Sequence, residues 1–163
     1  MKILLTEYAQ YNYWANKKIC DLLVTVDSSV LEKDIPSSFR TIKDTVYHVW
    51  GAESLWRQRI AGDSSNIPPS RNFKGSFAEG IELFNQESLK LIALVENSSE
   101  EDFLKVINYK NMAGQDFSST LFAIIMHCMN HSTFHRGQII TMLRNAGVTD
   151  LFSTDMINYF RTK

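Results

Sequence analysis

The chain has 163 residues, of which 44% are apolar and 21% are charged, and its formal net charge is −1. These values fit one globular domain with a sizeable core, so we expect a single domain over residues 1–163. The near-neutral charge gives no basic surface that would attract nucleic acid or an anionic membrane. No apolar run reaches the length of a membrane span, and the first residues turn polar and aromatic too early for a signal peptide, which predicts a cytoplasmic protein.

Apolar residues that recur every three or four positions predict a long helix from about Lys2 to Val26. A second long helix is expected from about Ile42 to Ala61. Thr41 is suited to cap its first turn and Gly62 to end it. The predicted buried stripe of the first helix consists of Leu4, Tyr8, Tyr11, Ala15, Ile19, Leu22 and Val26.

Two further long helices follow. The third is expected over about 76–97, because Ser76 and Glu79 form a pattern typical of a capping box. The fourth is expected over about 119–146, with Gly147 in the position that often ends a helix. The predicted buried face of the fourth helix consists of Leu121, Ile125, Cys128, Ser132, Ile139 and Leu143.

The remaining segments are shorter. Leu104–Phe117 has a pattern typical of a β-hairpin around Ala113 and Gly114, and Asp155–Lys163 is expected to form a final helix that packs Ile157 and Phe160 on the bundle. Four long amphipathic helices in a small domain predict an all-α fold. We therefore expect an antiparallel-type four-helix bundle with long connections, a short hairpin before the last long helix and a short C-terminal helix.

Histidines are concentrated on the inner faces of two predicted helices. His131 and His135 lie four residues apart in the apolar stretch Met126–Ile140, so they share one helix face. At about 100° per residue both fall on the buried side of the fourth helix, whereas His127 falls at its edge. His48 flanks the apolar stripe of the second helix and can face inward as well.

Two explanations compete for this set of histidines. Buried imidazoles can be core residues whose ring nitrogens are satisfied by hydrogen bonds. Alternatively, neutral imidazole is a common ligand for zinc, nickel and iron, and one divalent cation satisfies several inward nitrogens together. A pair four residues apart, combined with a third inward histidine, favours the metal site. The spacing does not choose among the three metals.

Four other side chains near the histidines have candidate roles. Gln138 could form a hydrogen bond in helix packing, or bond to a metal ligand or a metal-bound water. Arg136 is predicted to form a surface or interface ion pair. Glu53 is expected to be a charge on the flank of the second helix, with an alternative role as acceptor for a histidine N–H. Cys128 is predicted to be a core residue rather than a thiolate ligand.

Three motifs together resemble the DinB-like family of four-helix metalloenzymes. Asn130–Ile139 (NHSTFHRGQI) is similar to the family's H-x-x-x-H-R-G-Q motif on the last long helix. Tyr11–Asn16 (YNYWAN) is similar to its W-A-N motif, and Tyr47–Trp50 with Trp56 resembles its second-helix motif with the first metal-binding histidine. The resemblance spans nearly the whole chain.

The resemblance implies a divalent metal held by His48, His131 and His135. His127 resembles a frequent family histidine upstream of the pair, and it could contact a ligand or line the pocket. The resemblance also suggests a homodimer, in which exposed aromatic residues such as Tyr13 or Phe152 could form the interface.

Three protein ligands leave a coordination position open, as in catalytic metal sites. Some relatives resemble transferases that join a low-molecular-weight thiol to an electrophilic small molecule, so the resemblance implies a metal-dependent S-transferase. One alternative is a hydrolase that uses a metal-bound hydroxide. Another is a non-catalytic, stress-related protein whose metal is structural.

Overall fold

The computed structural model describes residues 1–63 and 65–163, and it confirms the predicted all-α bundle with a hairpin and a short last helix. The four long helices are α1 (Lys2–Leu23), α3 (Ile42–Ile60), α4 (Phe77–Asn97) and α5 (Leu121–Asn145). The short elements are α2 (Ser28–Leu31), η1 (Pro69–Asn72), η2 (Asp102–Leu104), β1 (Val106–Lys110), β2 (Asp116–Thr120) and α6 (Met156–Thr162). None of the described helices is both long and apolar enough to cross a membrane.

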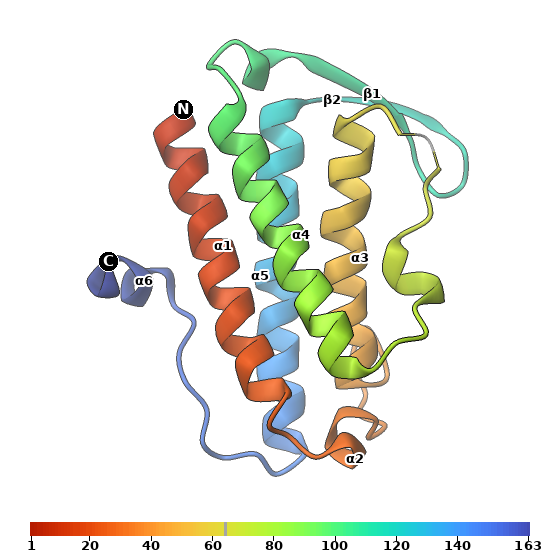
Figure 1. Cartoon of the computed structure of the whole chain (residues 1–163), viewed down its shortest axis with the longest axis vertical. Helices are drawn as coiled ribbons and strands as arrows, with labels where there is room; N and C mark the ends of the chain where they lie inside the picture. The colour runs from red at the N-terminus through yellow and green to blue at the C-terminus, as the bar shows by residue number, and fades with distance from the viewer. Residues whose placement is uncertain (64) are drawn as a thin grey trace.

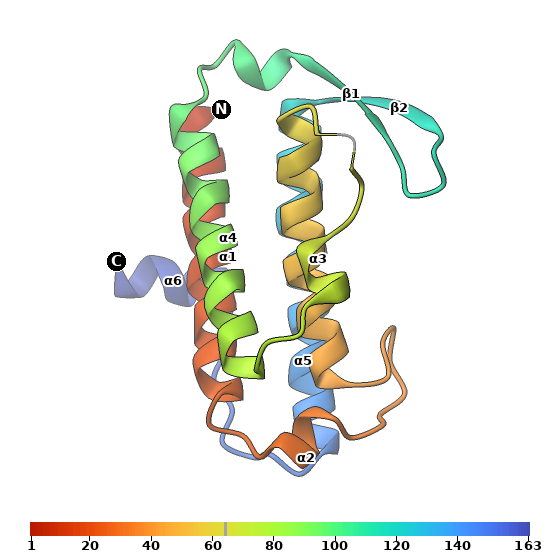
Figure 2. The same ribbon diagram turned by 45° about the vertical axis from the view of Figure 1, so that its right-hand side comes forward.

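Each long helix packs against two others. Helix α1 lies between α4 and α5, and α3 lies between the same two helices on the opposite side of the bundle. The neighbours α3 and α4 run in the same direction, because residues 65–76 return along the length of the bundle (Figures 1 and 2). This long return connection, typical of one class of four-helix bundle, adds a layer of chain outside α3.

The predicted helix caps are present. The Asp44 N–H donates to Thr41 Oγ1 at 2.9 Å at the start of α3. At the start of α4, the Ser76 N–H donates to Glu79 Oε2 at 2.7 Å, and the Glu79 N–H donates back to Ser76 Oγ at 3.3 Å. Both caps satisfy backbone donors that have no partner inside the helix, so they define where α3 and α4 begin.

The predicted stripe of α1 was wrong at its start. Leu4 is 64% exposed, whereas the next residue, Leu5, is fully buried. The inward face of α1 instead includes two polar residues, Asn12 and Asn16, which are 1% and 2% exposed. A stripe drawn through apolar residues alone misses this face, because it assigns both asparagines to solvent.

The hairpin is confirmed, although its second strand extends beyond the predicted end at Phe117. Strands β1 and β2 pair antiparallel, with Val106 opposite Thr120 and Lys110 opposite Asp116. Helix α5 begins directly after β2, and Thr120 Oγ1 accepts from the Ala123 N–H at 3.3 Å. The buried face of α5 is the predicted one.

The last helix packs on the bundle through a residue that was not predicted. Ile157 and Phe160 are 54% and 47% exposed, so that prediction was wrong. Tyr159 is buried instead, with its ring 6.0 Å from Tyr11 and 5.8 Å from Trp14. Its hydroxyl also reaches polar groups of α1, which explains why a tyrosine takes the inward position.

A buried carboxylate joins the four long helices. Glu53 of α3 is fully buried. Its Oε1 accepts from Asn12 Nδ2 at 2.7 Å, Asn16 Nδ2 at 2.9 Å and Ser132 Oγ at 2.9 Å, and its Oε2 accepts from Ser88 Oγ at 2.5 Å. These donors come from α1, α5 and α4, so one side chain sets how all four helices meet.

The same asparagines also contact a buried cation. Arg136 of α5 is 3% exposed, and its Nη1 donates to Asn12 Oδ1 at 2.6 Å and to Asn16 Oδ1 at 2.8 Å. Each amide therefore donates to the carboxylate of Glu53 and accepts from the guanidinium. This arrangement compensates both charges through aligned amide dipoles, which a buried charge requires. We call these residues the Glu53 network: Asn12, Asn16, Glu53, Ser88, Ser132 and Arg136.

Replacing Glu53 should destabilise the whole fold. Glu53→Ala leaves four buried donors and the Arg136 guanidinium without the carboxylate, so we expect a loss of about 3–5 kcal/mol in the free energy of unfolding. Urea denaturation followed by circular dichroism measures it. Glu82→Ala, at an exposed position on α4, is the matched control and should change stability little. Equal stability of the two variants would contradict the central role of Glu53.

Candidate metal centre

The structure brings the three predicted histidines together. His48 lies on α3, and His131 and His135 lie on the facing side of α5. The Nε2 atom of His131 is 2.9 Å from Nε2 of His48 and 3.2 Å from Nε2 of His135. One ligand atom from each ring lies within 4.8 Å of the others. Two antiparallel neighbouring helices therefore supply one convergent set of imidazoles.

The two distances that join His131 Nε2 to the other rings suit ligands of one metal ion. Two imidazoles bound to zinc at about 2.0–2.1 Å lie about 3.3 Å apart in tetrahedral geometry. At the same bond length, two neighbouring ligands of an octahedral ion lie about 2.9 Å apart. Three ring nitrogens that face one another cannot all be satisfied by mutual hydrogen bonds, because each carries at most one proton. The donor set therefore fits a divalent cation.

Gln138 orients one of the three rings. Its Oε1 lies 2.8 Å from His135 Nδ1, and its Nε2 donates to Ser38 Oγ at 2.7 Å. Since the amide oxygen faces the ring, His135 Nδ1–H is the donor and the lone pair of Nε2 points to the cluster. Of the two roles considered for Gln138, the structure supports the hydrogen bond to a candidate ligand.

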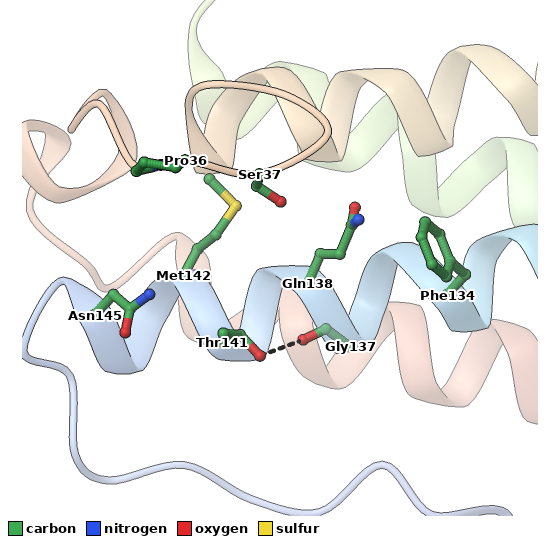
Figure 3. A pocket seen from close by; sticks show the side chains of 8 residues that line it. All are labelled: Pro36, Ser37, Phe134, Gly137, Gln138, Thr141, Met142 and Asn145. Atoms are coloured by element: carbon green, nitrogen blue, oxygen red, sulfur yellow. Dashed lines mark hydrogen bonds between the residues drawn. The ribbon is translucent and has the colours of Figure 1, made fainter.

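Gln138 also borders a cavity of about 250 Å³ between α5 and the loop that follows α2. Figure 3 shows its side chain pointing from α5 towards the loop that carries Ser37, on the same side of the helix as Phe134. The ring of Phe134 is 60% exposed and its centre lies 5.0 Å from that of His135. The loop after α2 therefore helps to hold the orientation of a candidate ligand.

Burial keeps the histidines neutral. Burial, and then the neighbouring His135, His48 and His127, lowers the pKa of His131 to about 3. Burial and His135 lower the pKa of His48 to about 4. Burial also lowers the pKa of His135, while the hydrogen bond to Gln138 acts in the opposite direction. Protons therefore compete weakly with a metal for these nitrogens at neutral pH.

His127 lies outside the three-histidine cluster. It is exposed, one turn before His131 on α5, and its ring centre lies 5.9 Å from that of His131. It packs at 5.1 Å against Trp56 of α3, which in turn contacts Tyr109 of the hairpin at 5.2 Å. Its place at the edge of the buried face agrees with the rotation expected from the sequence.

Two predictions about charged residues were wrong. Glu53 neither lies on the exposed flank of α3 nor accepts a hydrogen bond from a histidine, because its oxygens are used by the Glu53 network. Arg136 forms no surface ion pair, because it is buried and bonds to Asn12 and Asn16. One feature of the sequence could have indicated these buried roles of Glu53 and Arg136: Asn12 and Asn16 lie four residues apart on one face of α1.

Cys128 is a core residue, as predicted. It is 1% exposed, and burial raises the pKa of its thiol well above the usual value. Cys20 is buried to the same extent, and burial also raises its pKa. Neither thiol is suited to be a thiolate ligand or a nucleophile.

A larger cavity lies beside the histidines. It has a volume of about 790 Å³, and His48 is among the residues that line it. Phe39, from the loop before α3, also lines it and packs its ring 4.2 Å from that of His48. A small molecule in this cavity would therefore lie against a ring of the candidate metal centre.

The stability of the metal-free protein should depend on pH between about 6.5 and 4. The unfolded histidines bind protons below about pH 6.5, but His48 and His131 do so in the folded state only near pH 4 and 3, so stability falls as the pH drops. Thermal unfolding of metal-free protein from pH 8 to 4.5 measures this. The slope should be shallower for His48→Ala/His131→Ala, and identical slopes would contradict the prediction.

Ser132 and Ser88 allow the Glu53 network to be tested at the metal centre. Each hydroxyl donates one hydrogen bond to Glu53, but Ser132 follows His131 on α5, whereas Ser88 lies on α4, which carries none of the three histidines. Ser132→Ala and Ser88→Ala should each cost about 1–3 kcal/mol of stability. Only Ser132→Ala should weaken metal affinity, several-fold, in a chelator competition. Equal effects of the two variants on affinity would exclude a positioning role.

Comparisons with known proteins agree with the motifs in the sequence. A model of the DinB family matches residues 1–161. "Protein DinB" of Bacillus subtilis (strain 168) is 26% identical over 161 residues, which cover 94% of this chain and 92% of that protein. The fold is similar to the crystal structure of a DinB-like protein from Bacillus cereus ATCC 10987, with a TM-score of 0.67, 16% identity, and coverage of 88% of this chain and 91% of the other. With its family motifs in place and the family model matching almost its full length, the chain belongs to the DinB family.

Proposed function

We propose that this protein binds one divalent metal ion through His48, His131 and His135 and acts as a metal-dependent transferase that joins a low-molecular-weight thiol to an electrophilic small molecule. The observation that carries the proposal is the convergence of three neutral imidazole nitrogens at 2.9 and 3.2 Å. Zinc, nickel and iron(II) are all compatible with such ligands. We also propose that the protein is cytoplasmic, as its sequence predicts, and that it forms a homodimer, as the family resemblance implies.

Three protein ligands leave room for a molecule at the metal. Because none of the three is charged, a bound ion would keep its full positive charge, which lowers the pKa of a bound thiol and stabilises the thiolate. The chain's own residues hold this geometry: Gln138 orients His135, and Ser132 connects α5 to α3. Burial, and then the neighbouring histidines, lowers the pKa of His48 and of His131, which keeps their ring nitrogens free of protons at neutral pH.

The state of the cysteines favours an external thiol. Cys20 and Cys128 are buried with raised pKa values, so neither can supply the attacking sulfur. In the proposed reaction, the S–H bond of the thiol substrate breaks and its proton passes to solvent. The sulfur then forms a bond to the electrophilic carbon, while the bond from that carbon to its leaving group breaks and the leaving group departs with the electron pair. The cavity beside His48 holds the electrophile.

The test is a thiol titration into cobalt(II)-loaded protein. We expect 2-mercaptoethanol to produce a thiolate-to-cobalt absorption band, and the isosteric alcohol ethylene glycol to produce none. His131→Ala/His135→Ala should retain no cobalt by elemental analysis. His127→Ala, on the same helix but outside the cluster, should retain the metal and the thiol response.

Full metal retention in the double variant would refute the ligand assignment. Metal binding without a thiol response would refute the transferase. Turnover of an ester by the metal-loaded protein without thiol would favour a hydrolase in its place.

A further inference from the structure

The cavity beside His48 has one wall outside the helix bundle. Its lining comes from α3, from the loop over residues 38–40, from the return connection near η1, and from Met112 in the turn of the hairpin. In Figure 2 the return connection runs beside α3, and the hairpin turn lies beyond the upper half of the same helix. The volume of about 790 Å³ is in the range of small-molecule sites in proteins.

The outer wall is packed closely on α3. A Cβ atom at Gly51 would lie 2.5 Å from Ser70 Oγ and 3.0 Å from Pro68 Cβ, so only glycine permits this approach. Glycine in the middle of a helix is less favourable than alanine, and the close contact of α3 with η1 explains why a glycine is present here. The ring of Phe73 also packs 5.4 Å from Trp50 and 6.0 Å from Tyr47. Arg71, between Ser70 and Phe73, is therefore attached to a fixed wall.

The apolar part of the lining suits a flat, carbon-rich group. Phe39, Tyr47 and Phe73 contribute aromatic rings, and Leu55 and Met112 contribute aliphatic surface. Aromatic side chains give large contact areas at a low cost in conformational entropy. The body of the ligand is thus expected to be apolar.

The charged part of the lining leaves one cation available. Arg40 forms an ion pair with Asp34, and Lys43 forms one with Glu32 at 2.9 Å. The hydrogen bond to Glu32 is the main cause that raises the pKa of Lys43, and Asp44, the acid among the lining residues, adds a smaller electrostatic contribution. Over residues 1–63 and 65–163, Arg71 has no ion-pair partner. A free guanidinium at the edge of an apolar cavity is suited to bind a carboxylate with two hydrogen bonds.

We propose that this cavity binds a small organic anion, with its carboxylate on Arg71 and its apolar body among Phe39, Tyr47 and Phe73. The inference rests on the proposed function only where it takes this organic anion to be the electrophilic substrate. The binding itself needs no metal, since Arg71 is not part of the histidine cluster.

Calorimetric titration with two probes of equal length tests the proposal. The probes are 4-phenylbutyrate and the uncharged 4-phenylbutan-1-ol, titrated into metal-loaded protein and into the metal-free variant His131→Ala/His135→Ala. We expect the carboxylate to bind about tenfold more tightly than the alcohol in both proteins, as is typical of a hydrogen bond to a charged group. Arg71→Met, which retains an apolar stem, should remove that preference without weakening the alcohol.

Two further variants complete the test. Arg144→Met replaces an exposed arginine in the last turn of α5, away from the cavity, and should leave both affinities unchanged. Ala52→Phe should fill the cavity and weaken both probes, with a circular dichroism spectrum that shows an intact helical fold.

Three results would overturn the proposal: binding of neither probe to the wild type, a carboxylate preference that survives Arg71→Met, or a preference lost in the metal-free variant. The last result would mean that the carboxylate binds the metal. If metal binding itself failed while the Arg71-dependent preference remained, the proposed function would fall and the anion site would stand.

Discussion

The carboxylate of Glu53 lies where α3 meets α1, α4 and α5, and the arrangement of the bundle depends on it. A charge without partners in a protein interior is very costly, so every lone pair directed into the core needs a donor. Asn12, Asn16, Ser88 and Ser132 provide those donors at 2.5 to 2.9 Å. Apolar packing alone tolerates a shift of one helix along another, but these hydrogen bonds do not, because a shift would leave a buried charge unpaired.

The candidate metal centre lies between α3 and α5, two of the helices that Glu53 joins. On α5, Ser132 and Arg136 each directly follow a histidine of the cluster, and on α3 Glu53 lies five residues after His48. A step of about 100° per residue turns one side chain into the core and its neighbour towards the site. The hydrogen bond from Ser132 to Glu53 therefore aligns α5 with α3 at the level where the three imidazoles must meet.

The environment of the three histidines favours binding of a metal ion by neutral imidazole rings. Burial keeps the rings unprotonated, Gln138 sets the tautomer of His135, and none of the three candidate ligands carries a charge. The cysteines are removed from reaction by burial in the core. In the reaction proposed above, the reactive sulfur therefore comes from a substrate, and the cavity along α3 offers space for the electrophile.

The sequence by itself determined the elements and the candidate ligands. Helical periodicity located the four long helices, the caps at Thr41 and Ser76 marked two of their starts, and the spacing of His131 and His135 placed both on the inner face of α5. These features are local, because they depend on residues within a few turns of one another.

Only the tertiary structure decided the roles of the polar residues between the helices. Asn12, Asn16, Glu53 and Arg136 look like surface residues in a pattern that separates polar from apolar side chains. They are buried because they form hydrogen bonds with one another, between residues that lie 37 to 124 positions apart along the chain. The inward position of Tyr159 and the cavity wall at Arg71 also arise from contacts between distant segments. Periodicity along one helix carries no information on which partner another helix will present.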